Sequence, residues 1–286
     1  MSVYDLKIAD ILIRLQIDWP VETGENFLPF LMDFTEEPAE DISMQCVDAL
    51  PVPEEEPQWN LRGDGFARVS GEDCIFHRLP GAAPFSVELI QKNKRTILFR
   101  RDSGELPFTL QKVFNGLPFE GLLLRHDAFV LHSALVRWEN HGILFSAPSG
   151  TGKSTQATLW QQFMGAEILN GDRAALRKTE QGWHAWGIPM AGSSGIYRNE
   201  SAPVFALAVL KQGPENTIRR LSAIEAMGKL YPETSLFREN REWVQKILDL
   251  LMDLLNTVPV WLLSCRPDRE AVELLHRTLK NEVENL

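Results

Sequence analysis

The chain contains little cysteine and no long apolar segment. Three cysteines occur in 286 residues, at Cys46, Cys74 and Cys265, and none belongs to a CxxC pair. This spacing argues against a disulfide framework or a cysteine-rich zinc site, and it fits a reducing compartment. The most apolar run, 129–138, is interrupted by His132 and Arg137 and is shorter than the ~18 to 20 residues of a membrane span. Residues 1–10 lack the basic and apolar regions of a signal peptide, so a cytoplasmic protein is expected.

An excess of basic charge is also missing. The net charge is −10 at pH 7, and it is unevenly distributed. Residues 1–73 contain 4 Lys/Arg against 17 Asp/Glu, whereas residues 74–286 contain 25 against 22. Neither part has the strongly basic surface that non-specific nucleic-acid binding requires. The sequence therefore predicts neither a nucleic acid nor a membrane as partner, and it places the acidity at one end of the chain.

The length corresponds to about two domains of ordinary size. The first 125 residues are predicted to form a smaller, β-rich N-terminal domain, to which substrate recognition is assigned as a hypothesis. Residues 11–17 alternate between apolar and other side chains with the period of a half-buried strand. Similar short runs follow, separated by turn-forming residues, at 65–70, 74–78, 85–90 and 96–101.

An acidic, proline-bearing stretch, residues 36–57, lies between the early predicted strands. It includes Pro51-Val-Pro-Glu-Glu-Glu-Pro57. A solvated loop is the simpler interpretation of such a composition. A docking surface for a basic peptide is the alternative.

Residues 126–286 are predicted to form an α/β catalytic domain with a mixed, strand-rich core. Strands are expected at 129–138, 141–146, 166–169, 174–177, 183–186, 202–211 and 258–264. Helices are expected at 153–163, 222–230, 239–256 and 268–279, where apolar residues recur at helical spacing. Asp268 is the expected N-cap of the last helix.

A glycine-rich segment, Ala147-Pro-Ser-Gly-Thr-Gly-Lys-Ser154, fits the phosphate-binding P-loop (Walker A) pattern, with alanine in place of the first glycine. Glycines permit the tight turns that direct successive N–H groups toward phosphate oxygens. The lysine reaches the β- and γ-phosphates, and the serine hydroxyl ligates Mg²⁺. A strand before the loop and a helix after it complete the expected context. The predicted nucleotide-binding residues are Ser149, Gly150, Thr151, Gly152, Lys153, Ser154 and Thr155.

Asp172 follows the next predicted strand, within Leu169-Asn-Gly-Asp-Arg173. An acid at this place can bind Mg²⁺ or accept a proton from an attacking hydroxyl. The alternative is a turn residue, since Asn-Gly pairs favour tight turns. Ser154 and Asp172 are the candidate metal ligands, and ATP or GTP with Mg²⁺ is the expected cofactor. Elsewhere, Trp183 and Trp186 are candidates for stacking on an adenine or guiding a peptide, or for closing the edge of a core.

The segment from His132 through the glycine-rich loop to Thr155, followed by Leu169-Asn-Gly-Asp172, resembles the catalytic domain of HPr kinase/phosphorylases. These proteins are similar to phosphoenolpyruvate carboxykinase in their nucleotide-binding core. The wider group includes serine kinases of ribosomally made peptides, lasso peptides among them. The resemblance covers about residues 128–180. It implies that Asp172 is the general base that deprotonates a serine hydroxyl, that His132 lies beside it on an adjacent strand end, and that Lys153 completes the catalytic set.

The sequence departs from that family at two places. Arg173 replaces the second aspartate of an Asp-Asp pair, and the Glu-x-Arg-Gly-Leu-Gly stretch of the phosphorylase reaction is missing. The sequence therefore gives no support for the reverse reaction or for HPr as substrate. Three arginines are further candidates for phosphate contacts, with a solvated surface position as the alternative: Arg198, Arg266 and Arg269.

The leading interpretation is an ATP- and Mg²⁺-dependent kinase that phosphorylates a Ser or Thr hydroxyl of a peptide or protein, with tailoring of a lasso-type peptide as one form. A nucleotide-responsive binding module that transfers no phosphate is one alternative. A small-molecule hydroxyl kinase is another. HPr kinases form hexamers, so the resemblance also leaves a homo-oligomer open.

Overall fold

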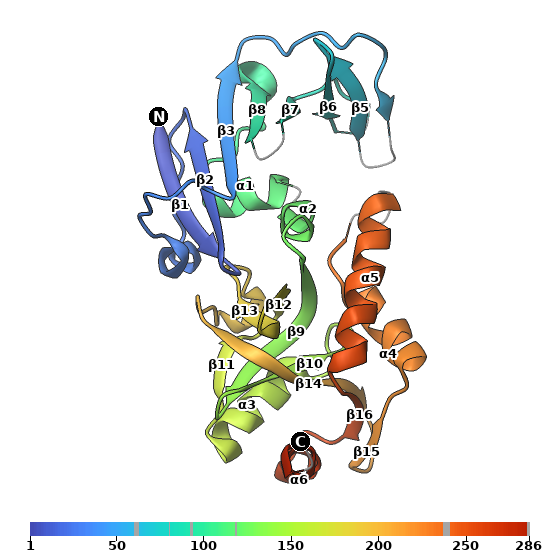
Figure 1. Cartoon of the computed structure of the whole chain (residues 1–286). Helices are drawn as coiled ribbons and strands as arrows, with labels where there is room; N and C mark the ends of the chain where they lie inside the picture. The colour runs from blue at the N-terminus through green and yellow to red at the C-terminus, as the bar shows by residue number, and fades with distance from the viewer. Residues whose placement is uncertain (60–62, 80, 92–93, 118, 237–240, 285–286) are drawn as a thin grey trace. The chain divides into compact units, whose positions relative to one another are not determined.

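The computed structural model describes residues 1–59, 63–79, 81–91, 94–117, 119–236 and 241–284 (Figure 1). The chain divides into two compact units, Met1–Phe119 and Glu120–Leu286. This division lies a few residues before the expected boundary at 125/126. Both units are rich in strands, and each contains a sheet of eight strands. The structure is therefore of the mixed α/β, strand-rich class.

The N-terminal unit is built on one sheet with the strand order β1-β2-β3-β8-β7-β6-β5-β4. The pairs β2–β3 and β3–β8 are parallel, and the other neighbours are antiparallel. Its helical segments are η1 (Glu25–Phe30), η2 (Arg101–Ser103) and α1 (Leu110–Gly116). Its strands are β1 (Ser2–Ile8), β2 (Ile11–Ile17), β3 (Glu40–Val47), β4 (Gln58–Trp59), β5 (Asp64–Val69), β6 (Glu72–His77), β7 (Ser86–Gln91) and β8 (Lys94–Arg100).

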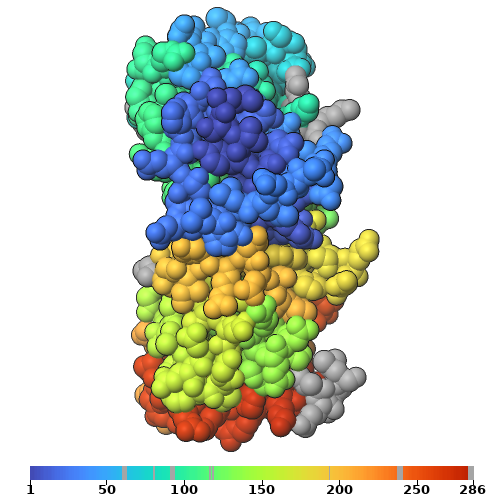
Figure 2. Space-filling model, turned by 90° about the vertical axis from the view of Figure 1, so that its left-hand side faces the viewer, coloured from blue at the N-terminus to red at the C-terminus, as the bar shows by residue number. Residues whose placement is uncertain are grey.

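Strand β2 shows why periodicity predicts five of the strands of this sheet, whereas β1, β3 and β4 were not expected. Ile11, Ile13, Leu15 and Ile17 are buried, and the residues between them are partly exposed. Successive side chains of a strand point to opposite faces, so this pattern places one apolar face against the core. Strand β1 pairs with β2 at the edge of the sheet, and Figure 2 shows the first residues, in dark blue, at the surface.

Eight of the 22 residues of the acidic stretch form a strand, so the prediction of a loop over residues 36–57 was wrong for that part. Strand β3 lies between β2 and β8, with Glu40, Ile42 and Met44 buried. The strand was not predicted because the alternation of apolar and polar residues, Ile42-Ser43-Met44, spans only three positions and is flanked by charged residues. Residues 48–57 do form irregular, mainly exposed chain, and Glu54, Glu55 and Glu56 are exposed.

The C-terminal unit contains the second sheet, ordered β10-β9-β12-β13-β14-β16-β15, with β11 paired to β9. Because β10 also pairs with β14, the strands β10, β9, β12, β13 and β14 form a closed circuit of pairings. The strands are β9 (Ala128–Trp138), β10 (His141–Ser146), β11 (Glu167–Asn170), β12 (Arg173–Thr179), β13 (Gly182–Gly187), β14 (Ser201–Gln212), β15 (Thr217–Arg220) and β16 (Val260–Cys265). The helices are α2 (Phe119–Leu124, which begins at the last residue of the first unit), α3 (Lys153–Met164), η3 (Gly192–Ser194), α4 (Ala223–Leu230), η4 (Tyr231–Glu233), α5 (Arg241–Thr257) and α6 (Arg269–Glu284).

Two apolar cores cover the two faces of this sheet. Along β9, Leu131 and Leu135 face a core with α4 and α5, whereas Ala134 and Val136 face a core with α3 and α6. The helices accordingly lie in two layers around the strands (Figure 1). No helix among the described residues is long and apolar enough to span a membrane. The expected strands of this half were found, and only the short β15 was missed.

Strands β10, β14 and β16 run parallel to one another, which places their carboxyl ends at the same edge of the sheet. The segment after β10 is the glycine-rich loop, residues 147–152. The segments after the other two begin at Gly213 and Arg266. In open α/β sheets, ligands bind in the crevice outside the carboxyl ends of such strands. This edge is therefore the first place to look for a functional site.

Candidate functional site

The glycine-rich loop connects β10 to α3, as its sequence predicted. Gly150 and Gly152 have φ angles of 77° and 116°, in the left-handed region that side chains disfavour. The backbone can therefore turn sharply here. Helix α3 begins at Lys153, so the first N–H groups of a helix and its positive dipole end lie at the loop.

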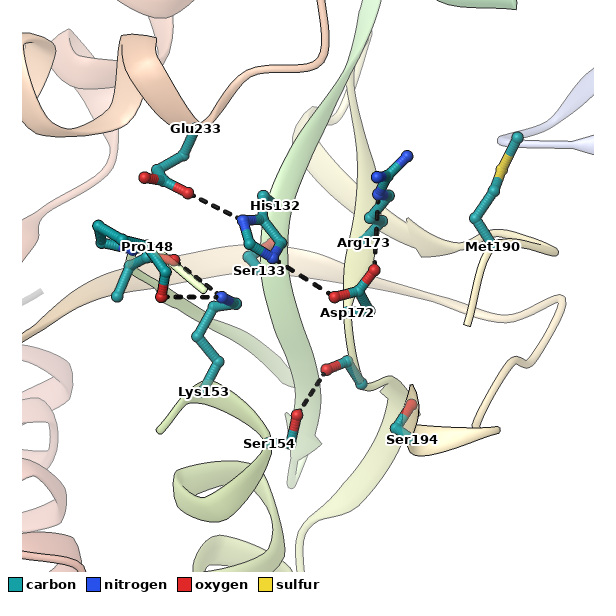
Figure 3. A network of polar contacts seen from close by, with 12 residues as sticks. His132, Ser133, Pro148, Lys153, Ser154, Asp172, Arg173, Met190, Ser194 and Glu233 are labelled. Carbon is teal, nitrogen blue, oxygen red and sulfur yellow. Dashed lines mark hydrogen bonds and ion pairs between the residues drawn. The ribbon is translucent and has the colours of Figure 1, made fainter. Parts of the chain in front are cut away.

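Lys153 is buried beside this loop, with 6% of its surface exposed. Its Nζ donates to the carbonyl of Ala147 at 2.8 Å and lies 3.4 Å from that of Pro148 (Figure 3). Among the described residues, no carboxylate is within ion-pair distance of this ammonium group. Burial lowers the pKa of Lys153, and the negative charges of Glu233 and Asp172 act in the opposite direction. The loop thus holds a desolvated cation with only neutral acceptors.

Ser154 lies one residue further along α3, and its Oγ donates to the carbonyl of Gly171 at 3.1 Å. This bond joins the start of α3 to the segment that carries Asp172. Mg²⁺ prefers hard oxygen ligands and is bound in phosphoryl-transfer sites by one or two carboxylates together with substrate phosphates. A serine hydroxyl and one carboxylate on adjoining segments fit that donor set. Among the described residues, no group of three or more His, Cys, Asp or Glu side chains is arranged to hold a metal by itself.

Asn170, at the end of β11, positions Asp172. Its Oδ1 accepts hydrogen bonds from the backbone N–H groups of Asp172 and Arg173, both at 2.9 Å. Its amide donates to the carbonyl of Ile188 at 2.9 Å, and the side chain is fully buried. The turn expected from the Asn-Gly pair therefore exists, and it serves to present the aspartate. The residue pattern alone predicts no such role for this asparagine.

Gly192 shows how closely the opposite segment approaches the aspartate. It has a φ of 55°, and a Cβ built on it would lie 2.5 Å from Cγ of Asp172. A side chain at this position would displace the carboxylate. The carboxylate is thus confined from several sides, yet 27% of the side-chain surface is exposed and accessible to a substrate.

His132 lies between two carboxylates (Figure 3). Its Nε2 is 3.4 Å from Oδ1 of Asp172, and its Nδ1 is 2.9 Å from Oε2 of Glu233. An ionised carboxylate only accepts hydrogen bonds, so Nδ1 donates to Glu233, and an attractive contact of Nε2 with Asp172 requires a proton on that nitrogen as well. The structure therefore brings together the histidine and the aspartate that the sequence singled out.

The position of His132 differs in one respect from the expectation of adjacent strand ends. It lies in the middle of β9, directly opposite Arg173 of β12 in the antiparallel register. From Ser133 onward, β9 pairs with β10. Every residue of β9 is buried except His132 and Arg137. His132 is thus a partly exposed residue in a mostly buried strand, at the position where the partner of β9 changes from β12 to β10.

Arg173 lies beside the carboxylate as well. Its Nε is 3.5 Å from Oδ2 of Asp172. The HPr kinase/phosphorylases that the sequence resembles have a second aspartate at this position, whereas this chain has a cation there, next to Asp172. Negative charge from two adjacent aspartates is therefore absent, and Arg173 is available to contact an anionic group.

Glu233 is the site residue that the sequence did not reveal. It ends η4 and is 101 positions from His132 in the chain. The two meet because Thr234 forms an isolated bridge with Leu131, and the N–H of Ser235 donates to the carbonyl of Val130 at 3.0 Å. No local motif surrounds Glu233, so only this long-range pairing identifies it.

The three candidate arginines are exposed, and each is paired with a nearby carboxylate. Arg198 lies 3.7 Å from Glu200, and Arg269 donates to Glu273 at 2.7 Å. Arg266 donates to Asp268 at 2.7 Å and to Glu270 at 2.6 Å. Of the three, Arg266 also lines a cavity next to Gly150.

Of the two interpretations of Trp183 and Trp186, a place at the edge of a core fits their burial better than stacking on a ligand. Trp183 is buried in a core, where its ring meets Phe129 edge to face and its Nε1 donates to Asp253 at 2.9 Å. Trp186 is buried as well, with 8% of its surface exposed. Trp183 thus closes the edge of a core, and the burial of Trp186 leaves little of its ring exposed for stacking.

Comparisons with known proteins give little beyond this geometry. No family model matches the chain, and no curated protein matches its sequence. Among solved structures, the chain is similar to the Hpr(Ser) kinase/phosphatase from Coxiella burnetii, with a TM-score of 0.33 and 13% sequence identity. The alignment covers 54% of this chain and 98% of that one. A function for this chain therefore has to be argued from its own residues.

Proposed function

We propose that this protein is an ATP- and Mg²⁺-dependent kinase that transfers the γ-phosphoryl group to a Ser or Thr hydroxyl of a peptide or protein. One observation carries the proposal. A carboxylate backed by a histidine and a second carboxylate lies next to a glycine-rich loop with a buried lysine. A base for a hydroxyl and a site for phosphates thus occur together.

The residues divide between holding the phosphates and handling the proton. The loop N–H groups and Lys153 bind the phosphates, and Lys153 exchanges its carbonyl partners for an anion. Asp172 accepts the proton of the attacking hydroxyl, and His132 keeps that carboxylate in place. Ser154 and Asp172 would hold Mg²⁺, which neutralises charge on the phosphates when it is bound. Phosphoryl transfer needs mainly this positioning and charge neutralisation from the protein.

The decisive test is phosphate transfer by the full-length chain. It is incubated with labelled ATP, Mg²⁺ and candidate Ser/Thr peptides, ribosomally made precursor peptides among them, and mass spectrometry detects the added phosphate. Asp172→Asn should lower kcat by about 10²- to 10⁴-fold, the usual contribution of a general base, and leave the Kd for ATP within about threefold. Asp249→Asn, an exposed acid on α5, is the matched control and should retain full activity.

The outcomes separate the alternatives. If ATP binds but no peptide, protein or small hydroxyl compound is phosphorylated, the chain is a nucleotide-binding module. If only small hydroxyl compounds are phosphorylated, the peptide acceptor is wrong while the chemistry stands. If Asp172→Asn transfers phosphate at the normal rate, the assignment of the base is wrong.

A further inference from the structure

A cavity of about 330 Å³ lies against the glycine-rich loop. It is lined by Gly150, Thr151 and Gly152 of the loop and by Thr155 and Gln156 of α3. The rest of its wall comes from the carboxyl ends of β14 and β16 and the residues that follow them. None of the polar groups assigned to proton transfer lines it, neither His132 nor Asp172 nor Glu233. This cavity is therefore separate from the place where the acceptor hydroxyl would react.

The location suits the non-phosphate part of a nucleotide. A triphosphate bound with its γ-phosphate near Asp172 must leave the loop at its α-phosphate end. The cavity shares three loop residues with the phosphate site and adjoins the first turn of α3. It also lies outside the carboxyl ends of parallel strands, where α/β sheets bind nucleosides.

The wall combines apolar surface with neutral polar groups. Leu210 and Pro267 contribute apolar surface, and Gln156 and Gln212 contribute carboxamides. Among the residues that the structure describes, no Asp or Glu side chain lines the cavity. Gln156 is 3% exposed, and its Oε1 is buried without a hydrogen-bond partner among the described residues. A buried polar atom of this kind is costly unless a ligand or water satisfies it.

The wall also bears on the choice between purines. A carboxamide offers one acceptor and two donors, which match the amino group and a ring nitrogen of adenine. It can also pair with N1–H and O6 of guanine, but the amino group of guanine adds a second donor beside N1–H, and among the described residues no carboxylate lines the cavity to accept from both. The cysteine in the wall adds no negative charge, because burial raises the pKa of the Cys265 thiol.

We propose that this cavity binds the adenosine half of ATP, with Leu210 and Pro267 against the base and Gln156 hydrogen-bonded to it. The proposal rests on the kinase function argued above, since it assumes that the loop binds the phosphates. It adds the place of the nucleoside and the residues that contact the base.

The experiment separates phosphate binding from nucleoside binding. Calorimetry measures the affinity of the full-length chain for ATP, GTP and inorganic tripolyphosphate, each with Mg²⁺. Wild type should bind ATP about tenfold or more tighter than either of the others. Pro267→Trp, an exposed position, should fill the cavity and lower ATP affinity about tenfold while tripolyphosphate affinity stays within about threefold. Pro20→Trp, at an exposed proline of the N-terminal unit, is the matched control and should change neither.

Two further measurements make the test independent of a single variant. Gln156→Leu, similar in size, should lower ATP affinity about fivefold or more, because the base loses its hydrogen bonds, while tripolyphosphate affinity stays within about threefold. Photolabelling of wild type with 8-azido-ATP should modify peptides that contain 210–213 or 265–267.

Three results would overturn the proposal: equal affinity of wild type for ATP and tripolyphosphate, equal weakening of both by Pro267→Trp, or photolabelling confined to other segments. If wild type binds tripolyphosphate but shows no preference for ATP, only the nucleoside cavity is wrong. If it binds neither ligand, the proposed function fails first.

Discussion

The two units treat a buried cation in opposite ways. In the N-terminal unit, Arg95 is 4% exposed and donates to Glu88, fully buried, at 2.5 Å. In the C-terminal unit, Lys153 is nearly as buried, but its polar contacts with the described residues are with carbonyl oxygens. A buried cation with a carboxylate is already neutralised and contributes to structure. A buried cation with neutral acceptors retains an attraction for an anion.

This difference separates a structural sheet from a binding edge. Arg95 and Glu88 lie on the adjacent strands β8 and β7, inside the sheet. Lys153 lies at the carboxyl end of β10, where the loop opens between parallel strands. The carboxylates near Lys153 interact with it only at longer range, and they contact His132 and Arg173 instead. The phosphate site is therefore kept positive, although the chain as a whole is acidic.

The largest effect is expected from breaking the ion pair. Glu88→Gln should lower the free energy of unfolding by about 3 to 5 kcal/mol, because it leaves the guanidinium of Arg95 buried without a counter-charge. Urea denaturation of the full-length chain measures the change. The double variant Glu88→Leu/Arg95→Met is the control and should recover most of the stability. A loss below about 1 kcal/mol in the single variant would contradict a structural role for the pair.

Lys153→Met should weaken ligand binding rather than stability. ATP affinity should fall by about 100-fold or more, because the phosphates lose their buried cation. The nucleotide-free protein should not lose stability, because a desolvated charge is removed along with its hydrogen bond to Ala147. Calorimetry and thermal unfolding measure the two quantities. Unchanged ATP affinity would remove this lysine from the site.

The same variant has a defined pH dependence. The pKa of Lys153 in the folded protein is lowered by burial from 10.5, so the unfolded chain binds the proton more strongly. Stability from this group is complete above pH 10.5 and is lost as the pH falls through the lowered pKa. The difference in Tm between Lys153→Met and wild type should therefore be larger at neutral pH than at pH 10.5.

Glu233→Gln should produce an intermediate effect that is confined to catalysis. An amide can donate to His132 as well as accept from it, so the ring loses its fixed orientation toward Asp172. We expect kcat to fall about tenfold while the Kd for ATP changes by less than about threefold. Glu233→Asp should restore part of the rate. A parallel loss of ATP affinity would instead place Glu233 in the phosphate site.

The smallest effect concerns the acidic segment. Glu54, Glu55 and Glu56 are exposed, and Glu54 also accepts a hydrogen bond from the N–H of Gly71 at 2.6 Å. If they dock a basic peptide substrate, reversing all three to lysine should raise KM several-fold at low salt, and added salt should reduce the difference. Glu36→Lys/Glu37→Lys is a control in the same acidic stretch. An unchanged KM would show that this segment is a solvated loop.

Local rules predicted much of the fold and the centre of the site. The alternation in β2, the loop with Gly150 and Gly152, and the start of α3 depend on interactions between residues close in the chain. Backbone conformation, side-chain period and helix capping act over this short range, so the printed residues suffice to anticipate them. The pairing of His132 with Asp172 required more, and it came from the resemblance to a known family.

Three other features depend on which distant segments become neighbours. Strand β3 forms within an acidic stretch because β2 and β8 accept it on both sides. Glu233 reaches His132 through the bridge between Thr234 and Leu131. The cavity beside the loop exists because β14 and β16 end where β10 ends. Sheet pairing joins residues without regard to their separation in the chain. Residue types and spacing therefore indicate the chemistry of a site, whereas long-range pairing decides which side chains complete it.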